Sequence, residues 1–134
     1  DMQASDRFNQ ALTAFTKARA RLHEVLQQDE NEFMRDAVIQ RFEFTFETAW
    51  KAAYRWLRDR GEPVNESAHS VLPRALANGL ILDVAGWDEL RLRRNQTSHT
   101  YDESLALDVS AFVRARAPAL FDELLQQLRN RANE

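Results

Sequence analysis

Apolar residues recur three or four positions apart over most of this chain, which is the period of an amphipathic α-helix. The pattern predicts a first helix over residues 6–28, capped by Ser5 or Asp6, and a second helix over residues 33–60. The second helix has two adjacent apolar faces, one of which includes Trp50. We therefore expect it to contact more than one neighbour, as a helix does at the centre of a bundle.

The rest of the chain continues the helical period, and we expect three further helices. Only three glycines and three prolines interrupt the 134 residues, which favours a few long helices over many short strands. The sequence thus predicts one all-α domain over residues 1–134. The remaining predicted helices are 67–78 with Ser67 as cap and Pro73 as a kink, a helix from Asp83 or Gly86 to a polar stretch near residue 95, and 102–129 with Pro118 as a bend.

Composition excludes several classes of protein. The chain has no cysteine, and so no disulfide framework, thiol nucleophile or cysteine-based zinc site. No apolar run approaches the roughly 18–20 residues that span a bilayer, and no signal peptide is visible, so we expect no membrane contact and a cytoplasmic location. The net charge of −3 argues against a general coat for nucleic acids but allows a local basic site.

The most chemically varied stretch is residues 91–103, between two predicted helices. The planar guanidinium of Arg94 suits a phosphate, and the imidazole of His99 suits proton transfer near neutral pH. Tyr101 can donate a hydrogen bond, stack on a base or be modified. The alternative interpretation is an interhelical turn whose polar residues are simply solvated.

Two local geometries are open for this stretch. In one unbroken helix, Arg94 and His99 would point about 140° apart. If the helix ends near Asn95, a tight turn could bring His99 back towards Arg94. The spacing of Thr100 and Glu103 is that of a capping box and favours the second geometry, with a new helix starting there.

Three acidic or basic positions of the second helix follow helical spacing: Glu43, Glu47 and Lys51. They form either a solvated stripe with ion pairs inside the helix, or a face that orients the side chains of the 91–103 stretch. We expect no metal site, because no histidine-bearing motif accompanies the two carboxylates. Arginine clusters, each expected to be a solvated helix face, occur at 55, 58 and 60, at 91, 93 and 94, and at 114 and 116.

The residues from Arg94 to Tyr101 read Arg-Asn-Gln-Thr-Ser-His-Thr-Tyr and match the pattern Arg-x4-His-x-Tyr. This motif resembles that of the HEPN superfamily, the higher eukaryote and prokaryote nucleotide-binding domains. The segment from Arg35 to Lys51 is similar to the long second helix of one branch, the nucleotidyltransferase substrate-binding proteins, which includes HepT-type toxins. The resemblance extends over roughly residues 30–125 and implies an up-and-down four-helix bundle of the HEPN type with an additional short helix.

The resemblance also implies an activity, that of a metal-independent endoribonuclease acting as the toxin of a toxin–antitoxin pair and needing no cofactor. Arg94 would hold the RNA phosphate and His99 would move the proton as catalytic residues. Asn95, Ser98 and Tyr101 would support the substrate. HEPN nucleases pair two motifs across a homodimer, so a composite cleft is expected.

Two other functions remain open. The chain could be a non-catalytic partner that presents substrate to a minimal nucleotidyltransferase. The two views are compatible, since in HepT-type systems that nucleotidyltransferase is the antitoxin and attaches AMP to the motif tyrosine, here Tyr101. An adduct there would block an RNA phosphate by its bulk and negative charge. The third possibility is a helical scaffold without chemistry.

Overall fold

The computed structural model of the chain describes residues 2–132, and the side chains of residues 6–132. These residues form helices without any strand, so the predicted all-α class is confirmed. Within the described residues no helix has the length and apolar character needed to cross a bilayer. The helices are α1 (Met2–Leu26), α2 (Glu32–Asp59), α3 (Ala68–Ala77), α4 (Val84–Gln96), the short 3-10 helix η1 (Thr97–His99) and α5 (Glu103–Ala132).

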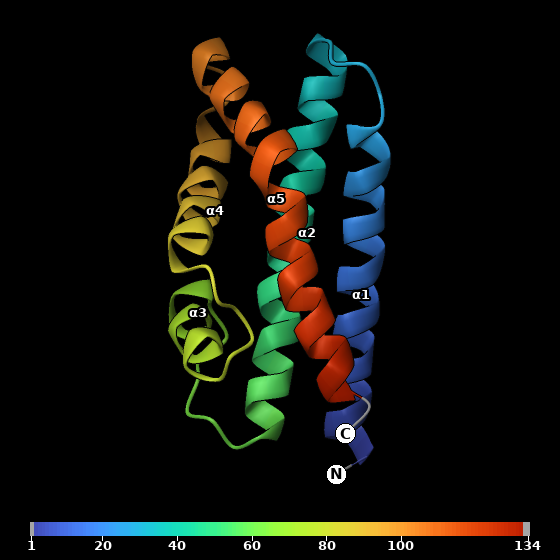
Figure 1. The fold of residues 1–134 in the computed structure, drawn as a ribbon, viewed down its shortest axis with the longest axis vertical. Helices are drawn as coiled ribbons and strands as arrows, with labels where there is room; N and C mark the ends of the chain where they lie inside the picture. Colours follow the sequence, from blue (N-terminus) through green and yellow to red (C-terminus); the bar gives the residue numbers. More distant parts are fainter. Residues whose placement is uncertain (1, 133–134) are drawn as a thin grey trace.

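The helices form an up-and-down bundle (Figure 1). α1 ascends, α2 descends, α4 ascends and α5 descends, and the short α3 lies below α4, so that α3 and α4 together make the fourth column. α2 packs against α1, α3, α4 and α5, which confirms the central position predicted from its two apolar faces. The four-helix bundle with an additional short helix is therefore the observed fold.

The core is centred on the ring of Phe121 in α5. Its centroid lies 6.2 Å from that of Phe15 in α1, 6.1 Å from that of Phe42 in α2 and 6.1 Å from that of Trp87 in α4. One aromatic ring thus touches every long column of the bundle. Because such rings bury large apolar areas at fixed angles, this contact sets the relative positions of α2 and α4, on which the site is built.

The helix ends confirm some of the sequence predictions and correct others. Ser67 caps α3 as predicted, since its hydroxyl accepts a hydrogen bond from the Ser70 backbone N–H at 3.2 Å. Asp83 likewise caps α4 through the Gly86 N–H at 2.8 Å. The predicted start of α1 at residue 6 is wrong, because the helix already begins at Met2. The two internal prolines, at 73 and 118, lie inside continuous helices.

Candidate functional site

The side chain of Arg94, in the last turn of α4, is held by groups from two helices. Its Nε donates to Oε1 of Glu47 at 3.1 Å, and its Nη1 lies 3.7 Å from Oε2 of Glu43. Both carboxylates belong to α2, one turn apart. The interpretation that these two glutamates orient the motif is therefore confirmed for Arg94, whereas Lys51 makes no hydrogen bond or ion pair with the motif within the described residues.

Glu47 has a second partner on its own helix. Its Oε2 accepts a hydrogen bond from the indole Nε1 of Trp50 at 3.0 Å. The Trp50 side chain is buried, with 7% of its surface exposed. A buried indole N–H needs an acceptor, so Trp50 fixes the carboxylate that in turn fixes Arg94.

Thr97 is the residue of this site that the sequence interpretation missed. Its hydroxyl donates to the Arg94 carbonyl at 2.6 Å and accepts from Arg94 Nη1 at 3.0 Å, and the residue is only 6% exposed. The hydroxyl thereby closes the end of α4 and anchors the guanidinium. A threonine three residues after the arginine was the available signal, since that spacing lets a hydroxyl reach the preceding turn of a helix.

The backbone leaves the α-helix at Gln96 and forms one 3-10 turn through His99. The predicted helix end near Asn95 is thus confirmed to within a residue. The predicted capping box is wrong in its cap: the Leu105 N–H bonds to the Asp102 side chain at 3.2 Å, and the Thr100 hydroxyl turns back to the Thr97 carbonyl. A direct carboxylate cap is favoured at the positive end of a helix, and it moves the start of α5 to Glu103.

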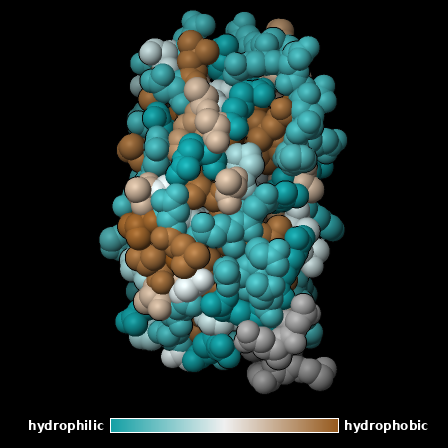
Figure 2. Space-filling model, in the orientation of Figure 1, coloured by the Kyte–Doolittle hydropathy of each residue, from teal (hydrophilic) through white to brown (hydrophobic). Residues whose placement is uncertain are grey.

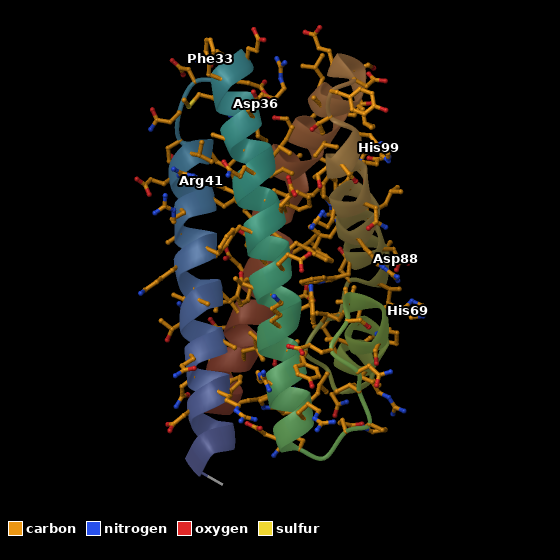
Figure 3. The ribbon with its side chains drawn as sticks, turned by 180° about the vertical axis from the view of Figure 1, so that it is seen from behind. Phe33, Asp36, Arg41, His69, Asp88 and His99 are labelled. Carbon is orange, nitrogen blue, oxygen red and sulfur yellow. The ribbon has the colours of Figure 1, made fainter. Side chains whose placement is uncertain are left out.

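His99 and Tyr101 lie on the outer side of this turn. Both side chains are exposed, Tyr101 by 88%, and their rings meet edge to face at 6.2 Å. Figure 3 shows His99 at the outer edge of the α4 column. Asn95 and Ser98 are exposed as well, and the Ser98 hydroxyl donates to the Asn95 carbonyl at 3.0 Å.

The side chains of Arg94 and His99 do not contact each other within one chain. Within residues 6–132 no hydrogen bond links the two side chains: the guanidinium is directed at α2, and the imidazole contacts Tyr101. The predicted turn that swings His99 back to Arg94 therefore stops short of a direct bond. What the fold does supply is a fixed cation and, five residues later, an accessible imidazole.

Comparison with known proteins agrees with this architecture. Residues 7–130 match the family model described as nucleotidyltransferase substrate binding protein like. The chain belongs to this family. The resemblance to the HepT-like branch of the HEPN superfamily is thereby confirmed.

One curated protein and one solved structure, both from Haemophilus influenzae, are similar to this chain. The chain is 36% identical over 99 residues to a protein named probable ribonuclease HepT, an alignment that covers 69% of this chain and 66% of the relative. It therefore spans just under two thirds of that relative's length. A solved structure, described as the fold of a substrate binding domain of a nucleotidyltransferase, matches with a TM-score of 0.66 and 26% identity over 93% of this chain and 98% of the other.

Proposed function

We propose that the chain is a metal-independent endoribonuclease that cleaves RNA with Arg94 and His99 and acts as the toxin of a toxin–antitoxin pair. The observation that carries the proposal is the state of the Arg94 guanidinium. Its Nε and Nη1 are engaged by Glu47, Thr97 and Glu43, while Nη2 has no hydrogen-bond partner within the described residues. A guanidinium held on one side and open on the other is suited to a phosphate oxygen.

The reaction follows from these two groups. The RNA 2′-oxygen attacks the adjacent phosphorus, so that the O2′–P bond forms and the P–O5′ bond breaks. The 2′-hydroxyl loses a proton and the departing 5′-oxygen gains one. His99 transfers one of these protons, and Arg94 stabilises the negative charge that develops on the phosphate.

Because Arg94 and His99 do not meet within one chain, the proposed reaction requires a homodimer. A two-fold axis beside the α4–α5 junction would set His99 of each copy against Arg94 of the other, because an isologous contact repeats both groups. It would also supply two imidazoles, one as base and one as acid. Asn95, Ser98 and Tyr101, all exposed on the same turn, would contact the substrate.

The test is RNA cleavage by purified protein freed of AMP and treated with a chelator. His99→Ala should lower the cleavage rate by about 100-fold or more, as expected when a proton-transfer group is lost, and should relieve growth arrest in cells. His23→Ala removes an exposed histidine of α1 and is the matched control. Cleavage by His99→Ala at the wild-type rate, with the dimer intact, would refute the proposal.

A second function is favoured by the family description and by the description of the solved relative: a partner of a nucleotidyltransferase. The cognate enzyme, a minimal nucleotidyltransferase antitoxin, would transfer AMP to Tyr101, whose 88% exposure makes the phenol accessible. Mass spectrometry after incubation with that enzyme and ATP should find the adduct on Tyr101 and none in Tyr101→Phe. An unmodified Tyr101 would count against this function.

A further inference from the structure

The outward side of α2 is hollowed along both edges. Between α1 and α2 lies a depression of about 580 Å³, and between α2 and α4 lies a second of about 370 Å³ that reaches Arg94. Figure 3 views this side of the molecule, with the label of Arg41 lying over α1. Gln40 and Phe44 line both depressions, so the two form one surface that crosses α2.

The first depression is lined by three cations and no acidic residue: Lys17, Arg21 and Arg41. None of the three has an ion-pair partner in the described part of the chain. Arg41 is held across the groove, since its Nη1 donates to the Arg21 backbone carbonyl at 2.7 Å, a bond that leaves its charge uncompensated. A chain of net charge −3 thus gathers three unpaired cations around one hollow.

The same surface carries an exposed aromatic ring. Phe44 is 67% exposed at the ridge between the two depressions, whereas Phe42 and Phe46 on the same helix are 0% and 2% exposed. Beyond the ridge, Glu43 and Glu47 are engaged by Arg94, and Lys51 makes no ion pair among the described residues. The ridge therefore joins a basic hollow to the candidate catalytic cation.

We propose that this surface is a track for single-stranded RNA, in which phosphates contact Lys17, Arg21 and Arg41 and a base stacks on Phe44 on the way to Arg94. Unpaired cations interleaved with an exposed aromatic ring are the features that bind single strands without sequence preference. The first hollow does not suit an isologous contact between two copies, because its lining would set cations against the same cations with no acid between them. The proposal rests on the proposed function for the identity of the ligand as RNA.

The test is binding of a fluorescent 12-nucleotide RNA, measured by anisotropy in the His99→Ala background so that no cleavage is needed. Lys17→Ala/Arg21→Ala should weaken binding about 10-fold at low salt and reduce the slope of log affinity against log salt by about 1.4, since each lost phosphate contact on a single strand contributes about 0.7. Arg58→Ala/Arg129→Ala is the matched control, because it also removes two exposed helical cations. It should change the affinity less than 2-fold.

The aromatic contact has its own matched pair. Phe44→Ala should weaken RNA binding about 5-fold or more, as expected when a base loses its stacking partner. Phe33→Ala removes another exposed phenylalanine of α2, 76% exposed, and should leave the affinity unchanged. Circular dichroism at 222 nm checks that all variants fold.

Three results would overturn the track. The two double variants could weaken binding equally, Phe44→Ala could bind RNA like the parent, or Phe44→Ala could change the sedimentation coefficient, which would make the ridge a protein contact. These results are distinct from failure of the nuclease proposal. A protein that binds RNA through these residues without cutting it keeps the track and loses the nuclease.

Discussion

The contacts of Glu47 and Glu43 predict how much stability the protein loses when each glutamate is replaced by alanine. Both glutamates lie on α2, both are 37% exposed, and both approach Arg94. They differ in that Glu47 makes a hydrogen bond at 3.1 Å and also accepts from Trp50, whereas Glu43 makes only an ion pair at 3.7 Å. Glu→Ala at either site changes intrinsic helix propensity little, so the contacts should decide the outcome.

The cost of Glu47→Ala has two parts. The pair with Arg94 is about a third exposed, and solvent screening limits its contribution to about 0.5–1 kcal/mol. The Trp50 indole N–H, which is buried, would lose its acceptor, and that adds about 1–2 kcal/mol. We expect a loss of about 2 kcal/mol for Glu47→Ala and less than about 1 kcal/mol for Glu43→Ala.

Thermal unfolding followed by circular dichroism measures the difference. An unfolding entropy of about 2.1 cal/mol/K per residue converts 2 kcal/mol into a fall in Tm of about 7 °C for a chain of this length. The Tm of the Glu43→Ala variant should fall by less than half as much at the same protein concentration. Glu47→Gln keeps an amide oxygen that can still accept a hydrogen bond from Trp50. Its Tm should therefore lie between those of Glu47→Ala and Glu43→Ala. Equal losses for Glu43→Ala and Glu47→Ala would refute the argument.

Two further predictions concern the start of α4. A Cβ added at Gly86 would lie 2.6 Å from Cδ2 of Leu120 and 2.8 Å from Oδ2 of Asp83. Gly86→Ala should therefore lower the free energy of unfolding, measured in urea, by about 1–3 kcal/mol. A variant as stable as the wild type would contradict this prediction. The hydrogen bond from the Gly86 N–H and the bond from Arg116 lower the pKa of the Asp83 carboxyl below its usual 3.8. Because the pKa of Asp83 is lower in the folded state, its stabilisation is present above the unfolded pKa and is lost as the pH falls through the folded pKa. Between about pH 5 and pH 2, the Tm of the Asp83→Asn variant should therefore fall less than the Tm of the wild type.

The fold was largely predictable from sequence because hydrophobic period and capping residues are local signals. The two apolar faces of residues 33–60 predicted the central position of α2, and Ser67 predicted the start of α3. The prediction that Thr100 caps α5 was wrong, and the reason for this is also local. Thr100 and Asp102 both offer an oxygen near the start of α5, and the spacing rule does not decide between them.

The candidate site was less predictable, because its contacts join distant segments. Glu47 and Arg94 are separated by 47 positions, and only the packing of α2 against α4 brings them within 3.1 Å. Helical spacing placed Glu43 and Glu47 on one face but left two directions open for that face. The same limit hid the basic hollow, since Lys17 and Arg21 come from α1 and Arg41 from α2.

The sharing of the Arg94 guanidinium between two carboxylates bears on selectivity. Any anion that approaches Nη2 meets a cation whose field is already partly cancelled by Glu43 and Glu47. A lone inorganic phosphate gains little there and should leave quickly. A polymer that is also held elsewhere on the surface arrives at a high effective concentration and can stay. If the proposed function holds, partial neutralisation of Arg94 would in this way keep abundant small metabolites from occupying the position proposed for the RNA.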